Sequence, residues 1–278
     1  MRFCVGLEVL LGSATLVLAG CESPAAVPPA PREMAFVELP ATQFEMGCTS
    51  GQSNCEEDEL PFEVTLTHPY RLSDTEVTRA QFQEVMGYDP SVVEGCGADC
   101  PADSVQWDEA AAFANALSEE ESLQLCYACT GEDAGVVCEV AVPAPECSGY
   151  RLPTEAEWEA AARCGTDLLF AGSDSPNEVA WHAGNSGERT HPVARLAPND
   201  CALFDMTGNV WEWTQDVYGP YPTEPATDPV GPISGLGRAN RGGSWSSAGT
   251  LLHVSSRHRG GDEAASPAFG FRLAAAAN

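Results

Sequence analysis

The sequence contains no lysine: its 13 basic residues are all arginine, against 41 acidic residues, which gives a formal net charge of −28 over 278 residues. With so little positive charge to neutralise phosphates, a nucleic-acid partner is not expected. An anionic membrane surface would repel the folded part as well. Excess carboxylate favours solubility and attracts divalent cations. A solvated acidic surface, as in some secreted proteins, is the simpler explanation of the charge.

A hydrophobic run long enough to cross a bilayer is also missing from the N-terminus. The apolar stretch over residues 9–19 follows Arg2 and is typical of the hydrophobic region of a secretory signal peptide. The Leu-Ala-Gly-Cys that ends at Cys21 resembles the cleavage box of bacterial lipoproteins, in which the cysteine is acylated. These features predict a signal peptide over 1–20 and a lipid on Cys21, with an ordinary secreted protein as the alternative.

The predicted lipid would hold the protein on a membrane, because two or three acyl chains anchor a protein firmly. Residues 21–33 are rich in proline and alanine and are expected to form an extended tether. Residues 34–278 show no second linker and no internal repeat, and are predicted to form one domain. We therefore expect an exported protein, anchored to the bacterial cell envelope at the outer membrane.

Cysteine is absent from the last 77 residues, after Cys201. Apart from Cys4 and the predicted lipidation site, ten cysteines remain, an even number that suits five disulfides in an exported protein. We expect two local pairs, a nested set over 126–147 and one long closure; zinc binding or a redox-active Cys126/Cys129 pair are the alternatives. The ten candidates are Cys48, Cys55, Cys96, Cys100, Cys126, Cys129, Cys138, Cys147, Cys164 and Cys201, with Cys48–Cys55, Cys96–Cys100 and Cys164–Cys201 as pairs.

Regular secondary structure is predicted mainly in the first 165 residues. Capping boxes at Thr78 and Thr154 predict two helices, which glycines at 87 and 165 would end. In the second of these, we expect Trp158 to face the core and the glutamates to cap the helix or face outward. A third helix is expected over 107–121, from apolar residues spaced along one face. Short strands are expected at 35–40, 44–47, 62–67, 69–73, 210–214 and 269–274, with Trp211 and Trp213 on a buried face.

Six strings occur in order along the chain: EVTRAQF (76–82), WDEA (107–110), GYRLPTEAEWEAAAR (149–163), LFDMTGNVWEWTQDVY (203–218), RGGSW (241–245) and FGFRLA (269–274). Together they closely resemble the formylglycine-generating enzyme family, the sulfatase-modifying-factor domain. The resemblance covers residues 34–275. It implies an α+β fold of the C-type-lectin-like kind that is loop-rich, low in regular secondary structure and, here, stabilised by disulfides.

The resemblance implies a calcium site in the stretch that contains Asp205. Its ligands would be the side chains of Asp205 and Glu212 and the carbonyls of Gly208 and Val210, an oxygen set that suits calcium. The alternative is an Asp/Glu pair that caps the turn. A second family calcium site would begin near Asn185, but the loop after it is short and lacks the expected aspartate.

The same resemblance argues against the family's chemistry. Active members oxidise a cysteine of a partner protein to formylglycine, with two cysteines of their own that hold copper(I). The matching positions here are Ser247 and Leu252. A serine hydroxyl is a poor copper(I) ligand and leucine binds no metal. We therefore expect no catalytic residues and no copper, and a domain that retains calcium but lacks oxidase activity.

What remains is a binding or scaffolding module for an envelope protein, a peptide or a glycan. Candidate residues of the binding groove are Ser244, Trp245, Ser247, Arg257 and Arg259. The two arginines could equally pair with carboxylates at the edge of the core. The alternative function is enzymatic: a diverged oxidoreductase of the same family that acts on a protein or peptide, or an unrecognised hydrolase, although no Gly-x-Ser-x-Gly elbow is present.

Overall fold

The computed structural model describes residues 33–261 and 265–277 of the chain. The predicted signal peptide, the tether to residue 32 and Cys21 lie outside the described residues. In the part that is described, no helix combines the length and the apolar character that a bilayer crossing requires.

Strands from both ends of the domain share one sheet. β1 (Phe36–Leu39) and β14 (Ala274–Ala276) pair antiparallel with the two edges of β4 (Tyr70–Ser73). A second sheet joins β10 (Ala226–Thr227), β3 (Phe62–Leu66) and β2 (Thr42–Met46), in that order. The predicted N-terminal strands are therefore confirmed, and the chain closes on itself where its last strand meets β4.

The central sheet has the order β12-β11-β9-β13. Its longest strand, β9 (Trp211–Val217), buries Trp211 and Trp213 as predicted. β11 (Arg238–Arg241) and β12 (Arg257–Gly260) follow antiparallel, and β13 (Phe269–Gly270) pairs in parallel. Two small sheets join β5 (Tyr127–Thr130) with β6 (Val137–Val140), and β7 (Ala180–Trp181) with β8 (Thr207–Gly208).

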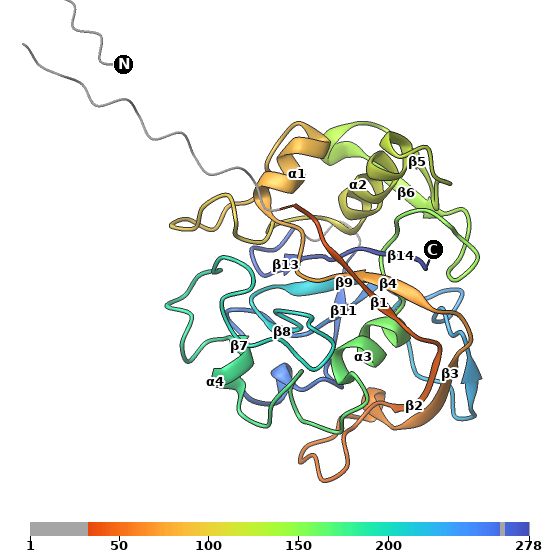
Figure 1. Ribbon diagram of the computed structural model, residues 1–278, viewed down its shortest axis with the longest axis vertical. Coiled ribbons are helices and arrows are strands. Elements are labelled where there is room, and N and C mark those ends of the chain that lie inside the picture. Colours follow the sequence, from red (N-terminus) through yellow and green to blue (C-terminus); the bar gives the residue numbers. More distant parts are fainter. Residues whose placement is uncertain (1–32, 262–264, 278) are drawn as a thin grey trace, which may run out of the picture. The chain divides into compact units, whose positions relative to one another are not determined.

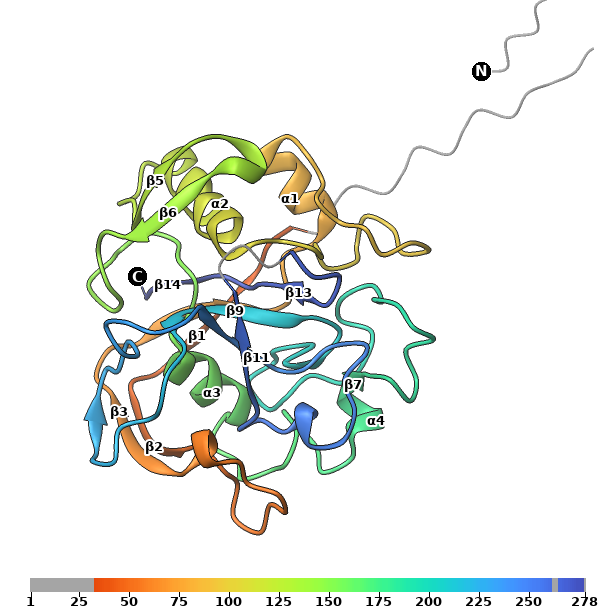
Figure 2. The ribbon, with the colours of Figure 1, turned by 180° about the vertical axis from the view of Figure 1, so that it is seen from behind.

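The helices lie on both sides of these central strands. α1 (Arg79–Met86) and α2 (Trp107–Glu120) lie with β5 and β6 on one side, and α3 (Glu155–Arg163) lies with β2 and β3 on the other (Figures 1 and 2). Each side has its own apolar core: Phe82 and Phe113 pack in the first, and Trp158 and Leu72 in the second. The α+β, loop-rich fold is confirmed.

The capping boxes at Thr78 and Thr154 are both present. Gly87 ends α1 in the left-handed region, at φ 81°. α3 ends one residue earlier than predicted, because Cys164 already adopts a left-handed φ of 46°. One short helix, α4 (Pro176–Val179), lies beyond the last predicted helix.

The predicted strand at 269–274 is divided into β13 and β14. Between them, the backbone of Phe271 and Leu273 bonds to Val77 and Ser73. These contacts turn the segment from the central sheet toward β4.

The cysteine predictions are confirmed. Cys48–Cys55, Cys96–Cys100 and Cys164–Cys201 are bonded, and the nested set is Cys126–Cys147 around Cys129–Cys138. Cys126 and Cys129 each bond to a different cysteine, so the structure favours the disulfide interpretation over a zinc site or a Cys126/Cys129 redox pair.

Glu157 caps α3 as predicted, but the expectation that the other glutamates of the helix face outward is wrong. Glu155, Glu157 and Glu159 are all buried. Glu157 closes the capping box and pairs with Arg151, while Glu155 and Glu159 pair with arginines from β11, β12 and α3 itself. The helix therefore buries three carboxylates, and the arginine side chains that bind them compensate the charge.

Candidate functional site

The turn in which the resemblance places the family's first cysteine follows directly after β11. Gly242 and Gly243 adopt φ values of 94° and 80°, and a Cβ at Gly243 would lie 2.8 Å from the Leu251 carbonyl oxygen. Glycine is therefore required for this turn. Ser247 is buried, its hydroxyl accepts the Ser244 amide hydrogen at 3.0 Å, and it lies 3.2 Å from the Ser244 hydroxyl. Both serines stabilise the turn.

Leu252, at the second cysteine position, lines a cavity of about 430 Å³. The leucine side chain is buried and packs with Phe170 and Val179. Every cysteine in the described part of the chain is in a disulfide. No described thiol is therefore available to bind copper(I) beside Leu252.

Two histidines, His182 and His253, line the same cavity. The Nδ1 atom of His182 accepts the Gly184 amide hydrogen at 3.1 Å, and its Nε2 lies 2.9 Å from the Asn177 amide oxygen. The Nδ1 atom of His253 is buried without a partner, and burial lowers the pKa of this side chain. With walls formed mainly by Phe170, Leu252 and other apolar groups, the cavity is suited to binding apolar groups.

The stretch predicted to hold calcium lies between the two cores. Asp205 is buried, and one of its carboxylate oxygens accepts the Ala194 amide hydrogen at 2.7 Å. Glu212 is buried as well, and both of its oxygens bond to Arg272, at 2.6 and 2.7 Å. The indole of Trp158 donates to Glu212 at 2.6 Å. Gly208, at φ 82°, makes the turn between the two acidic residues.

A third buried carboxylate, Glu76, completes this group and was missed at the level of sequence. It accepts the Val210 amide hydrogen at 3.1 Å and an Asn209 side-chain hydrogen at 2.7 Å. Burial, followed by the charges of Asp205 and Glu212, raises the pKa of Glu76 well above its usual range. Carboxylates are ligands of the kind that a hard divalent cation prefers, but both oxygens of Glu212 are bonded to Arg272 and one of them also to Trp158, so Arg272 is the cation that balances Glu212 in this structure.

Asn185, near which the second family calcium site would begin, has its side chain hydrogen-bonded to the backbone. Its oxygen accepts the His182 amide hydrogen at 2.8 Å and its amide donates to the Ala180 carbonyl at 2.9 Å. The neighbouring Ser186 donates to the Trp245 carbonyl. These bonds give Asn185 a structural role in the loop after β7.

The residues predicted to form a binding groove lie in different surroundings. Trp245 is half-buried, and its indole donates to the Pro267 carbonyl at 2.9 Å. Arg259 is exposed. Arg257 is buried and pairs with both oxygens of Glu155, at 2.7 Å each, as the alternative reading of the arginines predicted. It lines a different pocket from the one beside Leu252.

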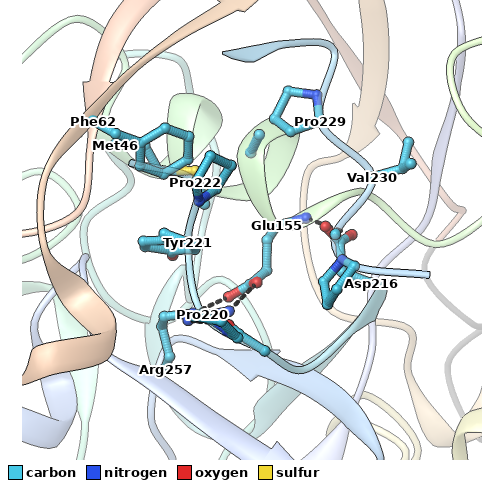
Figure 3. Close-up of a pocket in the computed structure, with 14 residues that line it drawn as sticks. Met46, Phe62, Glu155, Asp216, Pro220, Tyr221, Pro222, Pro229, Val230 and Arg257 are labelled. Atoms are coloured by element: carbon cyan, nitrogen blue, oxygen red, sulfur yellow. Dashed lines mark hydrogen bonds and ion pairs between the residues drawn. The ribbon is translucent and has the colours of Figure 1, made fainter. Parts of the chain in front are cut away.

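That second pocket, which we call the proline pocket, has a volume of about 260 Å³ and was not predicted (Figure 3). Its floor is the ion pair of Glu155 and Arg257 with the carboxyl group of Asp216, which accepts the Glu155 amide hydrogen at 2.9 Å. Burial and the nearby Glu155 charge raise the pKa of Asp216 well above its usual range. The apolar walls are Met46, Phe62, Ala156, Gly219, Pro220, Tyr221, Pro222, Pro229, Val230, Gly231 and Pro232.

Comparison with known proteins agrees with this geometry. The model of the sulfatase-modifying factor enzyme 1-like domain matches residues 23–277. The chain is 31% identical over 221 residues to the chaperone protein LppX of Paenibacillus barcinonensis, a match that covers 69% of this chain and 74% of that protein. It is 28% identical over 285 residues to the formylglycine-generating enzyme of Streptomyces coelicolor, covering 86% and 88% of the two chains.

A solved structure, Treponema denticola variable protein 1, superposes with a TM-score of 0.78 at 31% identity, covering 89% of this chain and 97% of that one. The family model spans most of the chain, and the solved structure shares its fold. The chain therefore belongs to the sulfatase-modifying factor enzyme 1-like family.

Proposed function

We propose that this protein is an envelope-anchored binding or scaffolding module of the family, without the oxidase activity of the formylglycine-generating enzymes. The observation that carries the proposal is the pair Ser247 and Leu252 at the family's cysteine positions. Ser247 bonds within its own turn, Leu252 packs into an apolar cluster, and the ten described cysteines are consumed by disulfides. A soft metal that needs thiolate ligands has none at this position.

The proposal predicts that copper-loaded protein forms no aldehyde on a Cys-x-Pro-x-Arg peptide under oxygen. Mass spectrometry of the peptide, with an aldehyde-reactive probe, measures the product. A formylglycine-generating enzyme with both cysteines, assayed in parallel, is the positive control. Aldehyde formation by this chain above the protein-free background would contradict the proposal.

A diverged oxidoreductase that acts on a protein or peptide is the second candidate. It is supported by the similarity to the Streptomyces enzyme, which extends over 88% of that enzyme's length. Metal analysis of the purified protein separates the two candidates. Stoichiometric copper or iron would favour the oxidoreductase, and calcium alone would favour the binding module.

Export and lipid anchoring through Cys21 belong to the same proposal. The Leu-Ala-Gly-Cys box supports them, and so do the disulfides, because disulfide-rich folds are typical of oxidising compartments. A tether of proline and alanine would hold the domain away from the membrane. At that distance, anionic lipid would not repel the negatively charged domain.

Calcium would be held by the side chains of Asp205 and Glu212 with the carbonyls of Gly208 and Val210, and it would neutralise the buried carboxylates there. We expect 1 mM calcium to raise the Tm of metal-free protein, since a ligand at about 100 times its Kd stabilises the folded state by about 2.7 kcal/mol. Differential scanning calorimetry with and without calcium measures the rise.

The substitution Asp205→Ala is expected to abolish the calcium-dependent rise. The exposed Asp200→Ala removes the same charge and should leave it unchanged. Each variant is compared with its own metal-free state, so a loss of intrinsic stability does not enter. An undiminished rise in Asp205→Ala would refute the assignment of this ligand.

A further inference from the structure

The proline pocket has the size and character of a receptor for one large apolar side chain. An apolar cavity of about 150 Å³ accommodates benzene, and this pocket measures about 260 Å³. Its walls are prolines, aromatic rings, Met46 and Val230. Figure 3 shows Tyr221 and Pro222 near Phe62 on one side, with Pro229 and Val230 on the other.

The pocket is pre-formed. The hydroxyl of Tyr221 accepts a hydrogen bond from Arg241 at 2.9 Å. The centroids of the Tyr221 and Phe62 rings are 4.9 Å apart, and the guanidinium of Arg257 lies 3.9 Å from the centroid of the Tyr221 ring. Arg257 also donates to the carbonyls of Asp58 and Gly219, which ties the two walls together. A ligand would therefore meet a rigid surface, which lowers the entropic cost of binding.

The segments that supply the walls carry exposed apolar side chains that the fold does not use. Val230 is 39% exposed, Ile233 is fully exposed and Leu236 is 74% exposed, all in the loop that forms one wall. Leu60, two residues before Phe62 on the opposite wall, is 59% exposed. Of these four residues Val230 lines the pocket, and the other three are near lining residues in sequence. Exposed apolar groups beside a concave site are typical of protein interaction surfaces.

The two chain segments that supply the walls of the pocket are acidic. The two wall segments, residues 56–66 and 217–237, contain five and two acidic residues, and neither contains arginine, lysine or histidine. Glu56, Glu57 and Glu224 are exposed. On the floor, by contrast, Arg257 balances Glu155, and the carboxyl group of Asp216 accepts the Glu155 amide hydrogen at 2.9 Å. The floor therefore suits an apolar group, and the rim suits cations.

We propose that the proline pocket docks a basic segment of a partner protein, which inserts one aromatic or large aliphatic side chain and places arginines or lysines against the acidic rim. This inference rests on the proposed binding role and names its site and the chemistry of its partner. The site shares no lining residue with the cavity beside Leu252, where the family's cysteine positions lie.

Fluorescein-labelled heptapeptides test the proposal by fluorescence anisotropy. The probe is Gly-Arg-Arg-Trp-Arg-Arg-Gly, compared with one peptide that has alanine at the centre and another that has glutamates in place of the arginines. We expect saturable binding of the probe and at least tenfold weaker binding of both others. The alanine peptide should bind more weakly because it leaves the pocket empty. The glutamate peptide should bind more weakly because the acidic rim repels it.

A rim substitution locates the binding on the protein. Val230→Arg places a cation and a longer side chain at the mouth, and we expect it to weaken probe binding at least tenfold. Val92→Arg makes the same change at an exposed valine in another loop and should leave binding within twofold of the wild type. Circular dichroism and the Tm of both variants verify that they are folded.

Three results would overturn the proposal: no saturable binding of the probe up to 1 mM, equal binding of the tryptophan and alanine peptides, or equal weakening by Val230→Arg and Val92→Arg. Self-association of the wild type that Val230→Arg abolishes would also overturn it, by making a second copy of the chain the occupant. The proposed function is tested by aldehyde formation, which these binding experiments do not measure. A failure of this proposal is therefore distinguishable from a failure of the proposed function.

Discussion

Replacement of Arg272 by methionine is expected to lower the free energy of unfolding by about 3–5 kcal/mol, because it removes one partner of a buried ion pair and leaves the other charged. Arg272 binds both oxygens of Glu212 and donates to the carbonyls of Ser73 and Phe204. It is fully buried. Its charge also lowers the pKa of Glu76 against the effects of burial and of two neighbouring carboxylates.

Thermal unfolding in metal-free buffer measures the effect, and the fall in Tm should be roughly 6–20 °C for a chain of this size. The matched control is Arg195→Met, the same substitution at an exposed arginine, which we expect to change the free energy by less than about 0.5 kcal/mol. A Tm for Arg272→Met within 2 °C of that control would show that the buried carboxylates do not depend on this cation.

A second buried cluster provides an internal comparison. Arg241 bonds to Glu155 and Glu159, but each of these carboxylates keeps another arginine: Arg257 binds Glu155, and Arg163 binds Glu159. Removal of Arg241 therefore leaves neither carboxylate without a cation. Glu212, by contrast, loses the guanidinium that binds both its oxygens, which places the larger effect at Arg272.

Local signals in the sequence predicted the parts of the fold that local chemistry decides. Thr78 and Thr154 begin their helices because each hydroxyl binds a backbone amide three residues later, an interaction within one turn. The alternation around Glu212 predicted that Trp211 and Trp213 share a buried face. The pairing of Cys164 with Cys201 followed from the count of cysteines that remained once the local pairs were made.

Burial of Glu155 and Glu159 was not predictable in this way. Glu155 lies in the first turn of a capped helix, where a glutamate is normally solvated, and Glu159 lies in the next turn with Arg163 four residues later as a local partner. Their distant partners, Arg257 and Arg241, are 102 and 82 residues away in sequence. Only the tertiary fold brings them together. The one feature of the sequence that pointed to buried ion pairs was that all of its basic residues are arginines, because arginine is the residue best suited to such pairs.

The candidate site likewise has a part that local sequence predicted and a part that only the tertiary fold forms. The family strings located Ser247 and Leu252, since the Gly-Gly turn fixes the positions that follow it. The proline pocket was missed because its walls come from Met46, Phe62, the start of α3 and residues 216–232, which no single stretch of sequence joins. The prolines at 220, 222, 229 and 232, in a segment without cations, were the one local indication of it.

Removal of the Cys164–Cys201 disulfide, by alanine at both positions, is expected to lower the free energy of unfolding by about 4 kcal/mol. The bond closes a separation of 37 residues, and the loss comes mainly from the greater freedom of the unfolded chain. In the folded state the two segments stay joined, because the side-chain amide of Asn199 donates to the carbonyls of Ala161 and Ala162 at 2.8 and 3.1 Å. Urea unfolding without reductant measures the difference.

Cys96–Cys100 is the matched control, because its separation is only four residues. Loop-closure entropy gives a loss of about 2 kcal/mol for the same double substitution there, roughly half the effect of the long closure. Cys164 and Cys201 are both only half-buried, so alanine at these sites leaves little cavity. A loss at Cys96–Cys100 that equals or exceeds the loss at Cys164–Cys201 would therefore show that native-state contacts, and not loop length, set the contribution of these bonds.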